Sequence, residues 1–82
     1  MPEYVPVSRY ADARERLEAL PSVGDVELVL DRPDLDQPCL EVHVHSYERV
    51  PPCVLRTIAE SDLGLRPDLS GTRPGEFVLV VV

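Results

Sequence analysis

A histidine pair beside a carboxylate is the first arrangement in this sequence that suggests chemistry. Glu41, His43 and His45 alternate along one predicted strand, so their side chains share one face. Imidazole and carboxylate groups bind zinc, nickel or copper, and these three residues are therefore candidate metal ligands. A zinc site needs three or four ligands, however, and a wet polar strand face is the simpler interpretation. We expect no bound metal and no cofactor.

Cys53 suggests a second chemistry, because a thiolate at the start of a helix can act as a nucleophile. The histidines alternate out of phase with the apolar residues of their strand, so they are expected to face away from the helices. Cys53 is expected on the helix side, as a small buried side chain. Cys39 is at the start of its strand, and the helix that carries Cys53 begins just after the end of that strand. The strand is about 20 Å long, so the two thiols are too far apart for a disulfide. The sequence therefore predicts two free thiols and no catalytic residue.

Apolar spacing predicts two helices that position these groups. The first covers residues 9–20, with Ser8 as its N-cap and with apolar residues at spacings of three and four. The second opens at Pro51-Pro52, since proline is tolerated in a first helical turn, and Gly64 is the expected residue just past its end. The apolar faces consist of Tyr10, Ala13, Leu17 and Leu20 in the first helix, and of Val54, Leu55, Ile58 and Ala59 in the second.

The sequence predicts three strands, two from alternation and one from a continuous apolar run. Residues 25–31 and 39–45 each place apolar side chains on one face and mostly polar side chains on the other, which favours a hairpin. Residues 76–82 form the last strand, and the segments 32–38 and 66–75 are loops rich in proline. Residues 4–7 are a possible additional first strand, which Pro6 weakens.

These elements predict a single domain over residues 1–82 of the α+β class. A small sheet of three or four strands carries two helices on one face. If residues 4–7 form a strand, the order is β-α-β-β-α-β, the ferredoxin-like pattern, which we prefer. Without that strand the order is α-β-β-α-β.

The charge composition is unusual. The net charge is −7, and all eight basic residues are arginine. In composition alone, the chain resembles small proteins of halophilic archaea, which work in molar salt; the resemblance names no biochemical family. An acidic chain without stacking aromatics on its open sheet face is a poor partner for nucleic acid. No apolar segment is long enough to span a membrane and no secretory signal is visible, so we expect a cytoplasmic protein.

The last strand predicts self-association. It is apolar at every position, and the preferred order places it at a sheet edge, where a row of valines invites pairing with another chain. We therefore expect a homodimer. The leading functional interpretation is a small acidic binding or protein-interaction domain whose ligand is unknown, with a metal-binding protein and a small thiol enzyme as alternatives. The expected interface residues are Phe77, Val78, Leu79, Val80, Val81 and Val82.

Overall fold

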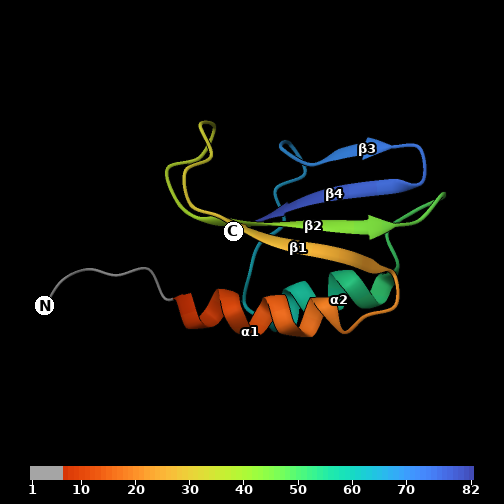
Figure 1. Ribbon diagram of the computed structural model, residues 1–82, viewed down its shortest axis with the longest axis horizontal. Coiled ribbons are helices and arrows are strands. Elements are labelled where there is room, and N and C mark those ends of the chain that lie inside the picture. The colour runs from red at the N-terminus through yellow and green to blue at the C-terminus, as the bar shows by residue number, and fades with distance from the viewer. Residues whose placement is uncertain (1–6) are drawn as a thin grey trace, which may run out of the picture.

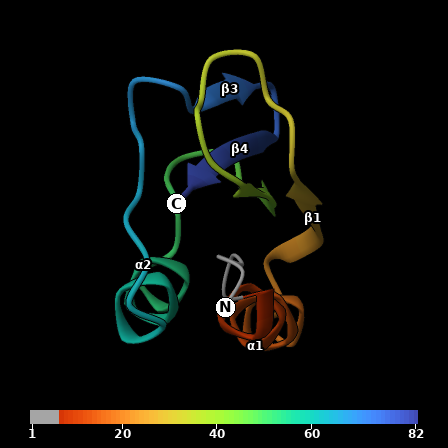
Figure 2. The same cartoon turned by 90° about the vertical axis from the view of Figure 1, so that its left-hand side faces the viewer.

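The computed structural model describes residues 7–82, which form two layers (Figure 1). One layer is a four-stranded antiparallel sheet with the order β1-β2-β4-β3. Two helices lie next to each other on one side of it, as Figure 2 shows. The elements along the chain are α1 (Val7–Glu18), β1 (Val23–Val29), β2 (Cys39–His45), α2 (Pro52–Glu60), β3 (Gly71–Arg73) and β4 (Glu76–Val81).

Helix α1 packs on the sheet through the predicted apolar stripe. Tyr10, Ala13 and Leu17 are at most 3 % exposed and belong to the main core. The Tyr10 hydroxyl also donates a hydrogen bond to the carbonyl of Pro38, at 3.2 Å, and so ties the helix to the start of β2. The helix therefore lies along the hairpin, close to β1.

The start of α1 differs from the prediction. The helix begins at Val7, so Ser8 lies inside it and is not the N-cap. Val7 is likewise helical and does not belong to the strand that the preferred order predicts over residues 4–7; residues 4–6 lie outside the described part of the chain. The ferredoxin-like order, which needs a strand before the first helix, is not the order that residues 7–82 form.

Strands β1 and β2 form the predicted antiparallel hairpin. Val26 pairs with Val42 and Leu28 with Leu40, and these four residues belong to or pack against the core beneath the helices. The alternating polar residues lie on the opposite face of the sheet. The pairing of β1 with β2 ends at Val29, which is two residues short of the predicted strand end.

Helix α2 ends in a Schellman motif two residues before the predicted glycine. Asp62 has a φ of 61°, and the Leu63 amide donates a hydrogen bond to the Ile58 carbonyl at 3.3 Å. Aspartate tolerates this left-handed conformation better than most residues. Leu63 then turns into the core and is 8 % exposed, which is the apolar contact that completes the motif.

Strand β3 lies within the segment that was predicted to be a loop. Residues 71–73 pair with residues 76–78, and the turn between them is Pro74-Gly75. Gly75 has a φ of 79°, and a proline followed by a residue with positive φ is the pattern of a type II turn. This short hairpin adds the fourth strand.

Strand β4 lies inside the sheet and has hydrogen-bonding partners on both sides. β2 pairs with it along its whole length, and β3 pairs with its first half on the other side. Past β3, the Gly64 and Arg66 amides donate to the carbonyls of Val82 and Val80, both at 2.8 Å. The prediction that the last strand lies at a sheet edge is therefore wrong.

The predicted apolar patch on β4 is also absent from the surface. Val80 and Val81 are completely buried, and Leu79 is 5 % exposed. Phe77, Leu79 and Val81 pack toward the helices, and Phe77, Val78 and Val82 are only partly exposed. A homodimer stays a prediction, but it needs a surface other than this strand.

The α+β class and the two helices on one face of a small sheet are confirmed, in the order α-β-β-α-β-β. This is the second predicted order with β3 added. Neither helix within residues 7–82 is long and apolar enough to cross a membrane.

Candidate functional site

His43 lies between two carboxylates on the sheet face that points away from the helices. Its Nδ1 is 3.2 Å from Oε2 of Glu76 on β4, and its Nε2 is 3.8 Å from Oε2 of Glu27 on β1. The Nε2 atom is buried and makes no hydrogen bond. The imidazole therefore shares a hydrogen bond with β4 and lies beside a carboxylate of β1.

The other two predicted metal ligands have different neighbours. Nη1 of Arg32 donates to Oε2 of Glu41 at 2.5 Å, so this carboxylate is already paired with a cation. The ring of His45 lies over Gly24, where a β-carbon would collide with it. Among the residues that the structure describes, no group of three histidine, cysteine or acidic side chains is arranged to hold a metal ion.

The loop between β1 and β2 supplies a guanidinium above the open face. Figures 1 and 2 show this loop projecting away from the helices. In addition to the bond from Nη1 to Glu41, Nε of Arg32 donates to Oδ1 of Asp34 at 2.5 Å. The hydrogen bond to Asp34 is the main reason why the pKa of Arg32 is raised, and the same bond lowers the pKa of Asp34. Arg32 is thus engaged by two carboxylates.

A hollow of about 320 Å³ lies on the open face beside this loop and is lined by Arg32, His43, Leu69 and Arg73, among others. Two guanidinium groups near one hollow suggest an anion site. Arg32 is paired with carboxylates, however, and Nη1 of Arg73 is 3.7 Å from Oε1 of Glu76. The cations of this hollow are therefore already balanced by the chain's own acids.

The two cysteines are free thiols in opposite environments. Cys39 is completely buried, and this burial raises the pKa of its thiol. Cys53 is exposed on the first turn of α2, so the prediction that it is a buried side chain is wrong. Burial favours the neutral thiol of Cys39, which is a weaker nucleophile than a thiolate, whereas the thiol of Cys53 is accessible to solvent.

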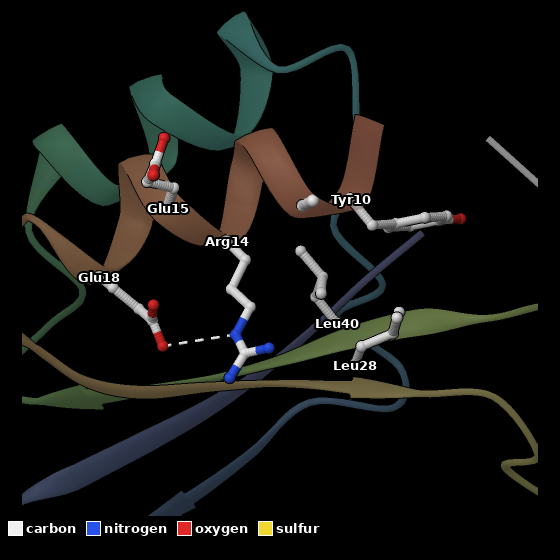
Figure 3. Close-up of a pocket in the computed structure, with 7 residues that line it drawn as sticks. Tyr10, Arg14, Glu15, Glu18, Leu28 and Leu40 are labelled. Atoms are coloured by element: carbon white, nitrogen blue, oxygen red, sulfur yellow. Dashed lines mark hydrogen bonds and ion pairs between the residues drawn. The ribbon is translucent and has the colours of Figure 1, made fainter. Parts of the chain in front are cut away.

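A groove runs between α1 and the outer strand β1, and Figure 3 shows its lining. It has a volume of about 350 Å³. Leu28 and Leu40 form the strand side, and Tyr10 closes one end from the helix. In Figure 3, Arg14 reaches from the helix down toward the strands, and its Nε is 3.4 Å from Oε2 of Glu18. The groove thus has an apolar floor and a charged rim.

The groove adjoins an open edge of the sheet. Within residues 7–82, β1 pairs only with β2, so the outer side of this seven-residue strand has no strand partner. The opposite edge is much shorter, because β3 has three residues. Leu30, just past the end of β1, is 64 % exposed. An unpaired strand edge, an apolar groove and an exposed leucine therefore occur together.

Sequence reasoning found the residues of this surface but not the surface itself. It assigned Tyr10 to the core and Leu28 and Leu30 to the inner face of a strand. Which strands lie at the edges depends on strand order; sequence reasoning placed β4 at an edge and assigned no position to β1. Comparison of the chain with protein-family models, with curated proteins and with solved structures found no significant match.

Proposed function

We propose that this protein is a small interaction domain that binds an extended polypeptide segment along β1, beside the groove formed with α1. The observation that carries the proposal is the open seven-residue edge next to an apolar groove. A segment that adds as a fifth strand would pair with the outward backbone groups of β1, which pair with no other strand within residues 7–82. Its alternate side chains would enter the groove.

Side-chain alternation determines what the bound segment presents to each face. Val26 and Leu28 are on the helix side of β1, so the bound segment needs apolar side chains there. Asp25 and Glu27 are on the opposite side, where polar or basic side chains fit. Cross-strand pairs of this kind contribute roughly 0.2–1 kcal/mol each relative to alanine pairs. The segment should therefore alternate in polarity as β1 does.

The setting that we propose is a cytoplasm of high ionic strength. The composition, with a net charge of −7 and arginine as the only basic residue type, supports adaptation to molar salt. Two free thiols favour a reducing compartment. In about 1 M salt the Debye length is near 3 Å, so an acidic edge repels an approaching chain much less than it would in dilute buffer.

A designed peptide tests strand addition directly. We expect a peptide with the sequence of residues 25–31, carrying Asp25→Arg, Glu27→Arg and Asp31→Arg, to bind along β1. Its arginines would face the acidic side of the strand, and its apolar residues would face the groove. In a titration followed by amide NMR, the shifts should concentrate in β1 and in the groove side of α1.

The matched control is a peptide of the same composition in a scrambled order that breaks the alternation. It has the same charge, so purely electrostatic attraction would act on both peptides alike. Equal shifts with both peptides, or shifts that avoid β1, would contradict the proposed function.

A further inference from the structure

We propose that the natural partner of β1 is a second copy of this chain, paired antiparallel about a two-fold axis at Leu28. The inference rests on the proposed function and names the occupant of the same edge. Antiparallel pairing of identical strands about a two-fold axis joins two sheets into one continuous sheet. Both copies then use the same residues.

The sequence of this strand reads nearly the same in both directions. With Leu28 on the axis, Val26 opposes Leu30 of the second copy, and Glu27 opposes Val29. The apolar residues on the helix side therefore meet apolar residues. A shift by one residue would turn each side chain to the wrong face, and a register centred on Val26 would set Asp25 against Glu27. In the Leu28 register the opposed carboxylates, Asp25 and Asp31 of the second copy, lie at the ends of the paired segment, whereas the centre pairs Glu27 with Val29.

The exposed residues past β1 support the same register. Alternation continues from Val26 through Leu30, but pairing within the chain stops at Val29. This leaves Leu30 with 64 % of its surface exposed. In the Leu28 register, Leu30 lies opposite Val26 of the second copy, next to that copy's groove. The pairing thus covers a leucine that the single chain leaves in water.

The required contact area brings α1 into the interface. A typical stable dimer buries about 800 Å² on each partner. This is about 15 % of the accessible surface of one chain, which is 5322 Å². One strand edge is too narrow to bury that area. The helix α1 packs next to β1, however, and can add its surface to the interface (Figure 2). The groove side of α1 carries Arg14 as well as Glu15 and Glu18, so two helices meeting there present both signs of charge.

Net charge makes this dimer dependent on salt. Two chains of charge −7 repel each other in dilute buffer. Asp25 also approaches Asp31 of the second copy, just beyond the end of β1. Screening in about 1 M NaCl removes most of this repulsion, and salt also strengthens apolar contacts. Salt should therefore favour association.

Light scattering at about 100 µM chain in about 1 M NaCl measures the assembly. We expect a dimer mass for the wild-type chain and a smaller mass in dilute buffer. Leu30→Lys should weaken the dimer at least tenfold, while Leu55→Lys should leave it intact. Leu55 is the matched control because it is also an exposed leucine, 43 % exposed, and lies on α2, which does not line the groove. A monomer mass for the wild-type chain, or equal dimerisation of both variants, would overturn the inference.

Cross-linking tests the register in a Cys53→Ser background. Leu28→Cys places two thiols at the axis, within the roughly 7 Å between Cα atoms that a disulfide requires. Leu30→Cys places them about 13 Å apart along the strands, so it is the control. We expect rapid oxidation to a dimer with Leu28→Cys alone; equal rates would overturn the Leu28 register. If the chain is monomeric but binds the designed peptide, a second copy is not the partner and the proposed function stands. If the chain neither dimerises nor binds the peptide, both proposals are refuted.

Discussion

Val80→Lys should unfold the protein. Val80 is completely buried on β4, between β2 on one side and the segment around Arg66 on the other. A lysine there loses its hydration, and an unpaired buried charge typically costs about 3–5 kcal/mol. A single core of this size supplies a folding free energy of about 3–5 kcal/mol, so the substitution removes most of it. Far-UV circular dichroism and urea unfolding would show the loss.

The control for this prediction is Leu55→Lys, which introduces the same group on the exposed side of α2. It should change the urea midpoint little, because the ammonium group remains in water. If Val80→Lys instead kept a cooperative urea transition and only halved the mass of an assembly, β4 would be an interface strand, as the sequence suggested. That outcome would contradict the sheet order described here.

The two thiols should differ in reactivity by orders of magnitude. In the native protein, a thiol reagent should modify Cys53 at the rate of an exposed cysteine. Cys39 should react only when the chain opens. Its rate should be lower than that of Cys53 by the opening equilibrium constant, which is about 10³-fold for a domain of marginal stability. Counting modified thiols over time in buffer and in urea measures both rates. Rapid modification of both thiols in buffer would contradict the burial of Cys39.

The same burial predicts a loss of stability at alkaline pH. The pKa of Cys39 is raised in the folded chain, so folding favours the neutral thiol. This contribution is complete below the ordinary thiol pKa of about 8.5 and is lost as the pH rises through the higher folded value. Cys39→Ala should remove this component of the pH dependence, and Cys53→Ala should not.

The local patterns in the sequence predicted the local structure. Alternation assigned Val26 and Leu28 to the apolar face of one strand and Leu40 and Val42 to that of the next, and the spacing from Tyr10 to Leu17 gave the buried face of α1. These patterns succeed because each strand or helix buries one face whatever its neighbours are. The cap at Asp62 was missed because glycine is the usual residue at such a position, and only the hydrogen bonds of the folded helix end show the aspartate in that role.

The position of β4 and the candidate site depended on long-range pairing. A strand of six apolar residues indicates burial on both faces, but not which strands lie beside it. Preferring a strand at residues 4–7 placed β4 at an edge, so the edge considered for association was that of β4 and not that of β1. The contacts of the candidate metal ligands could not be predicted for a related reason, because the partners of Glu41 and His43 come from a loop and from neighbouring strands. One signal was present in the sequence: the near-symmetric pattern from Asp25 to Asp31.

Hydrogen exchange of the β1 amides at two chain concentrations is the most direct test of the central claim, that β1 is the edge at which two copies of the chain pair. In about 1 M NaCl, the outward amides of β1 are free at low concentration and become paired when the edge is occupied. We predict slower exchange in β1 at about 100 µM than at about 1 µM, with no change in β3 at the opposite edge. Equal exchange of the β1 amides at both concentrations, or protection confined to β3, would contradict the account.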